Sequence, residues 1–417
     1  MKAWTSAQAY LRLRRSQWLD RDGISALQRR KLGRLLEHAY RYVPFHRERF
    51  DAAGLKPRDI RSAADLSHLP ITTKRELLDA GPSAITSRGF GADELVSRRT
   101  TGSTGEPFTF RVDRRWIAVQ QGLFLRALAM AGWGFGRKLV LIGDGQGERV
   151  PRWMRWSHVP HDLSAAGMFE RIRRLRPDVL YGWVTPLLNV ALHALDEGVE
   201  LPVRRSVITT AEALDGPTRE LLGEVFGVEV FELFGLTEMG IVAGECGAHD
   251  GLHLAEDVAI VESVEGRLIL TNLDLLATPF LRYQTGDVGR PGSRECPCGR
   301  RSARLKRIEG RLVDCVRLRD GGSISPYRLT LAIEPIPGIR RYRVVQEDYE
   351  RFSVELEDDR AERAGVDESV VAAVEGVLGS GVTVRIVRRA RLDPPPGHKF
   401  RVVESRVRPA GDEPCAS

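Results

Sequence analysis

The stretch RTTGSTGEPF, Arg99–Phe108, combines glycines and hydroxyl side chains in a pattern that could bind an anion, in a chain of 417 residues. Its glycines let backbone N–H groups turn toward an anion, and its hydroxyl side chains add further hydrogen-bond donors. We therefore predict a polyphosphate-binding loop formed by Thr100, Thr101, Gly102, Ser103, Thr104 and Gly105. The stretch lacks the lysine of a Walker-type phosphate loop, and an ordinary turn can have the same composition.

Three later segments carry groups that a nucleotide site needs. FGLTEMG places Thr237, a hydroxyl donor for an α-phosphate, beside Glu238, a carboxylate that can hold magnesium. RYQTGD ends in Asp287, a short acceptor suited to ribose hydroxyls, although an aspartate there also closes ordinary turns. PPPGHKF puts Lys399, one of the few lysines in the chain, on a loop rich in proline and glycine.

These motifs together resemble those of a known superfamily. TTGSTGEP, FGLTEMG, RYQTGD, IEGRLVD and GHKFR follow one another as do the core motifs of adenylate-forming, acyl-CoA synthetase-like enzymes. The segments LLEHAYRYVPFHRERF, LPITTKREL, YGWVTPLLNVA, GLHLAED and CPCGRRSARLKRIEGR resemble, more narrowly, the phenylacetate-coenzyme A ligase family with its CapK-type members. The likeness extends from Leu35 to Val403.

The resemblance implies a reaction in two steps and a fold to carry it. A carboxylic acid, aromatic or small, attacks the α-phosphate of ATP to give an acyl-adenylate and pyrophosphate. The thiol of coenzyme A then displaces AMP. The implied fold is α/β, with a large N-terminal domain of sheets flanked by helices, residues 1–310. A small mobile α+β domain, residues 311–417, carries the catalytic lysine.

The phosphate end of the implied site draws on both domains. The loop Thr100–Gly105 would hold the β- and γ-phosphates, Thr237 would contact the α-phosphate, and Glu238 would hold magnesium. Lys399 would bridge the attacking carboxylate and the α-phosphate. A carboxylate and a triphosphate repel each other, so this chemistry depends mainly on positioning and charge neutralisation.

The nucleoside end of the implied site uses other side chains. Phe234, followed by Gly235, would stack on adenine, with Glu212 of TAEAL nearby. Asp287 would bind the ribose, helped by Arg311. These assignments come from the family resemblance, matched motif by motif.

The C-terminal part departs from the family pattern at the hinge. Val313 stands where the family usually carries an aspartate, with Asp314 following, and the segment GGSISP replaces a more usual sequence. The acceptor therefore stays open between coenzyme A, an amine and a carrier-protein thiol. Assembly into a homodimer also stays open.

The cysteines form two short clusters that could bind a metal. GECGAHDGLH and RECPCGRR supply Cys246, Cys296 and Cys298, together with His249 or His253. Three thiolates and one imidazole are a suitable tetrahedral set for structural zinc, and we favour His253 as the histidine. The alternative is that the cysteines are small buried apolar residues, but glycine, proline and arginine surround them here.

Composition limits the remaining functional classes. The hydrophobic fraction of 42% and charged fraction of 29% are typical of a globular enzyme. No apolar run approaches the ~18 residues of a membrane span, and MKAWTSAQAYLRLRRS lacks a signal-peptide core, so we expect a cytoplasmic protein without a membrane partner. The net charge of +7 raises the alternative of a zinc-stabilised nucleic-acid-binding module. The arginines are scattered rather than interleaved with stacking aromatics, so we expect no nucleic-acid partner.

The elements that must position these residues are predicted to alternate. Residues 7–43 have a helical pattern that ends before Pro44, and LPITTKRELLDAG offers a threonine cap for a short helix. LVSRRTTGSTGEPFTFRVD is expected to form a strand, a glycine loop and a second strand. The strands DVLYGW, SVITTAEAL, EVFELFGLTEMG and GRLILTNL then place functional loops at their ends, as in α/β proteins.

Overall fold

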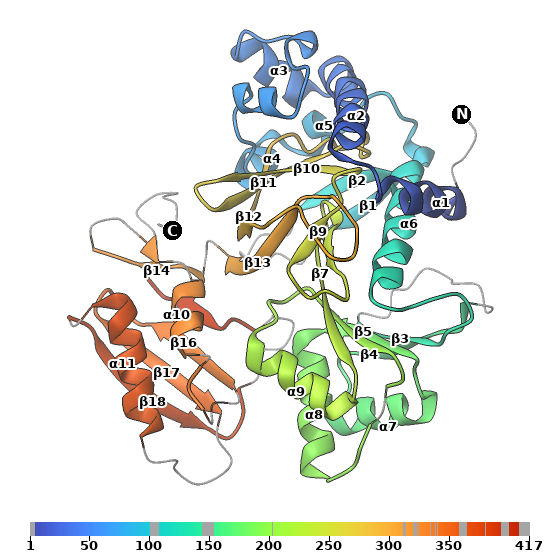
Figure 1. The fold of residues 1–417 in the computed structure, drawn as a ribbon. Helices are drawn as coiled ribbons and strands as arrows, with labels where there is room; N and C mark the ends of the chain where they lie inside the picture. Colours follow the sequence, from blue (N-terminus) through green and yellow to red (C-terminus); the bar gives the residue numbers. More distant parts are fainter. Residues whose placement is uncertain are drawn as a thin grey trace. The chain divides into compact units, whose positions relative to one another are not determined.

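A computed structural model describes residues 5–100, 108–143, 154–201, 203–311, 314–319, 323–324, 326–333, 335–337, 339, 341–357, 365–379, 381–392 and 400–407 (Figure 1). The chain divides into two compact units. The first comprises Met1–Ala131, Leu233–Thr285 and Gly289–Arg307, and the second comprises Gly132–Glu232, Gly286–Val288 and Ile308–Ser417. The functional division of the chain at 310/311 stays a prediction.

The first unit begins with helices whose caps are visible in the sequence. The predicted helical stretch consists of two helices, α1 (Ser6–Ser16) and α2 (Arg21–Tyr42), and Asp20 caps α2 by accepting from Gly23 N at 2.9 Å. The helix α3 (Pro44–Ala52) starts at the proline that ends α2. Thr73 caps α4 (Lys74–Ala80), as predicted, and α5 (Pro82–Ile85) and α6 (Arg114–Met130) follow.

The strands of the first unit are mostly antiparallel. A hairpin pairs β1 (Leu95–Arg99) with β2 (Thr109–Asp113), which confirms the two predicted strands. The larger sheet has the order β10-β11-β12-β13-β9-β8-β7. Its strands are β7 (Glu229–Leu236), β8 (Gly240–Glu245), β9 (Leu252–Leu254), β10 (Ala259–Val264), β11 (Arg267–Asn272), β12 (Tyr283–Pro291) and β13 (Arg304–Arg311). The strands β7, β12 and β13 have residues in both units.

The second unit contains a parallel sheet with helices between its strands. The order is β6-β5-β3-β4, and the neighbours are parallel. The strands are β3 (Leu139–Gly143), β4 (Trp156–Pro160), β5 (Val179–Trp183) and β6 (Ser206–Thr210). The helices α7 (Ala165–Leu175), α8 (Val184–Asp196) and α9 (Gly216–Phe226) bury apolar residues against one another and these strands. The predicted α/β class is therefore confirmed.

A second sheet in the same unit is built from the last part of the chain. Its order is β18-β17-β16-β19, formed by β16 (Arg341–Gln346), β17 (Arg351–Glu357), β18 (Thr383–Arg389) and β19 (Val403–Ser405). The helices α10 (Pro326–Ile333) and α11 (Val366–Leu378) share an apolar core with this sheet (Figure 1). A short hairpin pairs β14 (Val316–Arg317) with β15 (Ser323–Ile324). This small α+β assembly agrees with the predicted C-terminal architecture.

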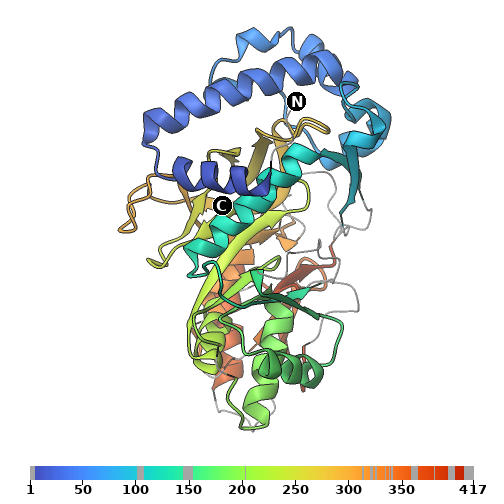
Figure 2. The ribbon, with the colours of Figure 1, turned by 90° about the vertical axis from the view of Figure 1, so that its right-hand side faces the viewer.

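A buried ion-pair network fixes the N-terminal helices within the first unit, where α1 lies against α6 (Figure 2). Arg126 of α6 pairs with Asp257 at 2.7 Å and also donates to the carbonyl of Leu13 in α1. Lys31 of α2 donates to the Asp257 carbonyl at 2.6 Å and pairs with Asp274. Burial disfavours ionisation of Asp257, but the charges of Arg126 and Lys31 outweigh it and hold the Asp257 pKa below its usual value.

Replacing Arg126 by methionine should destabilise the protein by about 3 to 5 kcal/mol, because a buried carboxylate loses its main counter-charge. Urea unfolding followed by circular dichroism measures this free energy. Arg173→Met is the control, since Arg173 pairs with Glu170 on an exposed face of α7, and its loss should leave the free energy of unfolding close to that of wild type. Equal effects of the two substitutions would contradict a stabilising role for the network.

Among the described helices, none combines the length and the apolar character needed to cross a membrane. The expected cytoplasmic location stays a prediction.

Candidate functional site

The turn after β7 presents Thr237 and Glu238, and glycines make its shape possible. A hydrogen bond from Met239 N to Leu236 O at 3.2 Å closes the turn. Gly240 has φ +71, and a Cβ there would lie 1.8 Å from Oε1 of Gln120. A Cβ on Gly235 would lie 2.8 Å from the Gly240 carbonyl oxygen. The sequence FGLTEMG therefore encodes a tight turn that larger residues would distort.

Two side chains from other elements hold this turn in place. Gln120 of α6 accepts from Ile241 N at 3.1 Å and donates to Met239 O at 3.2 Å. Asn272, the last residue of β11, also donates to Met239 O, at 3.4 Å. Glu238 is buried, and the hydroxyl of Tyr283 donates to its Oε1 at 3.1 Å. The hydroxyl of Thr237 and the oriented carboxylate of Glu238 thus lie on adjacent residues of a backbone that is held in place.

The base of the predicted phosphate loop is closed on both strands of the β1–β2 hairpin. Thr100 N donates to Phe108 O at 2.9 Å, and Phe108 N donates to Thr100 Oγ1 at 3.1 Å. Thr100 is buried. The rest of the predicted loop, Thr101, Gly102, Ser103, Thr104 and Gly105, lies outside the described residues.

The other predicted nucleotide-site residues lie in separate elements. Phe234 is buried in β7 of the first unit, at a break in register between β7 and β8. Asp287 is buried in β12, and Arg311 ends β13; both belong to the second unit. Lys399 lies outside the described residues.

Glu212 belongs to the second unit and follows β6. Its Oε2 accepts from Thr185 N at 2.7 Å, at the start of α8, and its Oε1 accepts from Phe400 N at 3.3 Å. His161 follows β4 and Trp183 ends β5, the two strands that flank β3 in the parallel sheet, and their ring centroids lie 4.7 Å apart. The carboxyl ends of β4, β5 and β6 thus gather these side chains at one edge of the parallel sheet, the usual place for a ligand in an α/β protein.

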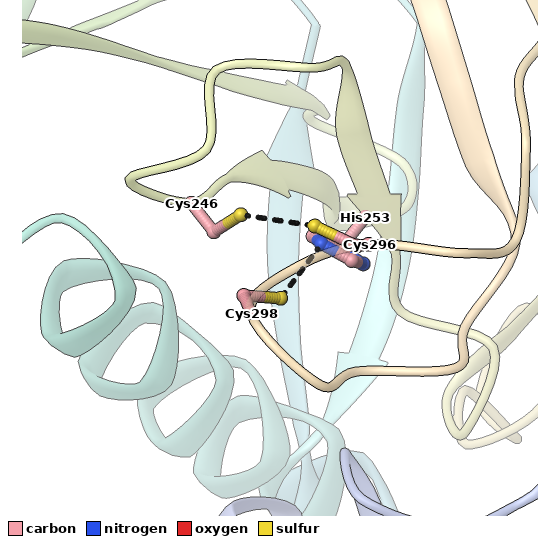
Figure 3. Close-up of side chains that lie close together, drawn as sticks. All are labelled: Cys246, His253, Cys296 and Cys298. Atoms are coloured by element: carbon pink, nitrogen blue, oxygen red, sulfur yellow. Dashed lines mark hydrogen bonds between the residues drawn. The ribbon is translucent and has the colours of Figure 1, made fainter.

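A second cluster brings together the four predicted metal ligands (Figure 3). Cys246 follows β8, His253 lies in β9, and Cys296 and Cys298 lie between β12 and β13. The ligand atoms all lie within 4.8 Å of one another, with Cys246 Sγ 3.6 Å from Cys296 Sγ and Cys298 Sγ 3.3 Å from His253 Nε2. Tetrahedral zinc with Zn–S bonds of about 2.3 Å needs sulfur atoms about 3.8 Å apart, so the four residues fit that ion.

The surroundings favour the metal-ligand forms of His253 and Cys298, whereas burial raises the pKa of the Cys246 thiol to about 12 and favours its neutral form in the absence of a metal. Burial, with the charges of Arg300 and Arg304, lowers the His253 pKa to about 4, so the imidazole is neutral at pH 7. His253 Nδ1 lies 3.0 Å from the hydroxyl of Ser302, which orients Nε2 toward the cysteines. Burial opposes ionisation of Cys298, but hydrogen bonds from Arg300 outweigh it and lower the Cys298 pKa.

His249, the other candidate histidine, is not in the cluster. Its Nδ1 lies 3.3 Å from a carboxylate oxygen of Glu245. Sequence reasoning missed Tyr283, Gln120 and Ser302, which orient the predicted residues. Tyr283 lies inside the RYQTGD motif, where its hydroxyl was an available signal, whereas Gln120 had none because its contacts span more than a hundred residues.

The sequence of the chain is similar to those of several known proteins. No protein-family model matches the chain. It is 30% identical over 339 residues to the phenylacetate-coenzyme A ligase of Aromatoleum evansii, covering 72% of the chain and 73% of that protein. It is 29% identical over 363 residues to the phenylacetate-coenzyme A ligase of Thermus thermophilus, covering 78% and 79%. Protein CapK of Staphylococcus aureus is more distant, at 24% identity over 355 residues, covering 77% and 76%.

Solved structures show the same fold. The structure of a 2-hydroxyisobutyryl-CoA ligase in its postadenylation state has a TM-score of 0.78 at 19% identity, covering 93% of the chain and 91% of that protein. The predicted family resemblance is therefore confirmed by relatives that match most of the sequence. The chain belongs to the phenylacetate-coenzyme A ligase family of AMP-forming acid–thiol ligases.

Proposed function

We propose that this protein uses ATP to convert a carboxylic acid into an acyl-adenylate and pyrophosphate, and then transfers the acyl group to coenzyme A. The observation that carries the proposal is the fixed turn with Thr237 beside Glu238, whose carboxylate is buried and oriented by Tyr283. Such a pair supplies a donor for the α-phosphate and a ligand for its magnesium. The relatives that match most of the chain are named as ligases that join phenylacetate to coenzyme A.

The remaining residues divide the work of binding the nucleotide. The loop Thr100–Gly105 holds the β- and γ-phosphates, Phe234 stacks on adenine, and Asp287 with Arg311 binds the ribose. Lys399 neutralises charge between the attacking carboxylate and the α-phosphate. Magnesium held by Glu238 would supply positive charge where the phosphates crowd together.

The proposed acid is a flat aromatic or small carboxylic acid. His161 and Trp183, in contact at the carboxyl edge of the parallel sheet, offer a face on which a ring can pack. Phenylacetate in the names of the relatives and anthranilate in that of a structural neighbour, at a TM-score of 0.58 and 13% identity, agree with this class. Identification of the final product distinguishes coenzyme A from the alternative acceptors, an amine or a carrier-protein thiol.

The test incubates the protein with ATP, magnesium and single acids from aryl, hydroxy and amino classes, and measures pyrophosphate. Coenzyme A, an amine or a carrier thiol is then added to the best acid, and the product is identified by mass spectrometry. We expect an aryl acid to give the acyl-coenzyme A thioester. An amide product would identify an amine as the acceptor in place of coenzyme A, and a carrier-bound product would identify a carrier thiol. If no acid gave pyrophosphate, the result would contradict adenylation.

Glu238→Gln should lower the rate of acyl-adenylate formation about 100-fold, because the amide keeps the shape of the carboxylate but loses the charge that holds magnesium. The dependence of the rate on magnesium concentration should shift to higher values. Glu224→Gln, on an exposed position of α9, is the control and should behave as wild type. An unchanged magnesium dependence in Glu238→Gln would exclude this residue as the ligand.

We further propose that Cys246, His253, Cys296 and Cys298 hold one structural zinc ion. Its four protein ligands would leave no open position for substrate, so the ion would stabilise the connection between β8, β9 and β13 rather than react. The support for this proposal is the distance set and the neutral, oriented imidazole.

A further inference from the structure

Four residues of the second unit, Thr185, Glu212, Arg341 and Phe400, form a closed ring of contacts, and only Glu212 among them belongs to the predicted nucleotide site. One half of the ring is Glu212, whose two carboxylate oxygens accept from Thr185 N at 2.7 Å and from Phe400 N at 3.3 Å. Glu212 thus ties the first turn of α8 to the backbone just before β19. Each of these bonds is charge-assisted, and such bonds are stronger than those between neutral groups.

Arg341 forms the other half of the ring. Its Nη2 donates to Thr185 Oγ1 at 3.3 Å, and its guanidinium carbon lies 3.9 Å from the centroid of the Phe400 ring. This distance is within the range of a cation–π contact. Arg341, the first residue of β16, is buried, with 5% of its surface exposed.

A buried guanidinium is costly unless its surroundings compensate the charge. The next core residues of β16, Tyr342 and Val344, pack into the apolar core of the small sheet, whereas Arg341 contacts Thr185 and the Phe400 ring. The arginine side chain therefore has partners on α8 and in the segment just before β19.

The ring contacts Phe400, which follows Lys399, the lysine proposed to act in adenylation. The Phe400 N–H that donates to Glu212 belongs to the residue that directly follows Lys399 in the sequence. We infer that Arg341, with Glu212 and Thr185, is a positioning residue that holds the chain at Phe400 during adenylation of the acid. This inference rests on the proposed function, because it assigns the ring to the first half-reaction.

The test compares Arg341→Met and Phe400→Leu with the control Arg343→Met. Arg343 lies two residues further along β16 and pairs with Glu355 inside the small sheet. Two half-reactions are measured separately: acid-dependent exchange of pyrophosphate into ATP, and thioester formation from synthetic acyl-adenylate and coenzyme A. Hydrogen–deuterium exchange of peptides covering 400–407 and 184–190 reports on the ring without needing activity.

Arg341→Met and Phe400→Leu should each slow pyrophosphate exchange about 100-fold, because misplaced reacting groups cost about that factor. Thioester formation should be unchanged, and deuterium uptake should rise in both peptides. Arg343→Met should leave all three measurements as in wild type. An equal loss in both half-reactions, or unchanged deuterium uptake in Arg341→Met, would overturn the inference.

Failure of the proposed function would look different. Wild-type protein would then show no pyrophosphate exchange with any acid, while deuterium uptake could still be compared. Faster deuterium uptake in Arg341→Met would support the claim that the ring restrains the backbone at Phe400. Unchanged uptake would contradict that claim.

Discussion

Replacement of Lys399 by alanine is expected to lower the rate of acyl-adenylate formation by about 100- to 1,000-fold. The attacking carboxylate and the α-phosphate are both negative, and removing the one cation assigned between them leaves their repulsion uncompensated. Acid-dependent pyrophosphate exchange measures the effect. Lys306→Ala, which changes an exposed lysine of β13, is the control and should retain wild-type exchange.

The same Lys399→Ala protein should still convert synthetic acyl-adenylate and coenzyme A to the thioester. This bypass separates a role in adenylation from general damage to the fold. Near-normal pyrophosphate exchange in Lys399→Ala would remove this lysine from the proposed site, whatever the thioester assay showed.

Loss of zinc should lower the stability of the folded protein. Wild-type protein should contain one zinc ion per chain, and His253→Ala should contain none. An ion bound at a free concentration 1,000 times its Kd stabilises the folded state by about 4 kcal/mol, so His253→Ala and chelated wild type should unfold at a lower temperature. Elemental analysis and calorimetry measure the two quantities.

His249→Ala provides a matched control for the zinc prediction. His249 is close in sequence but contacts Glu245 instead of the cysteines, so its loss should leave the zinc content unchanged. Wild-type protein that contains no zinc after purification without chelator would contradict the site. Zinc loss in His249→Ala with retention in His253→Ala would exchange the roles of the two histidines.

Local sequence patterns predicted most of the elements of this fold. Thr73 caps α4 and Pro44 ends α2, as expected from short-range rules. The break between α1 and α2 was missed because the apolar pattern continues through it, and the signal was the single capping residue Asp20. Caps act over three residues, whereas helical periodicity is judged over several turns.

The parts of the candidate sites that could be predicted are those whose residues lie close together in the sequence. The short spacing of the cysteines predicted a cluster with His253, and the structure brings these side chains together. The motif FGLTEMG predicted Thr237 and Glu238 at the end of a strand, whereas the tight turn that holds them is seen only in the structure. Gln120 and Arg341 were not predictable, because they act on partners more than a hundred residues away. Nothing in their local sequence distinguishes them from other polar residues on an element.

The most direct test of the central claim is exchange of labelled pyrophosphate into ATP with magnesium and an aryl acid, in the absence of coenzyme A and any other acceptor. Formation of a free acyl-adenylate predicts exchange that depends on the acid and disappears in Lys399→Ala. Exchange that requires an added acceptor, or that is absent with every acid tested, would contradict adenylation as the first step.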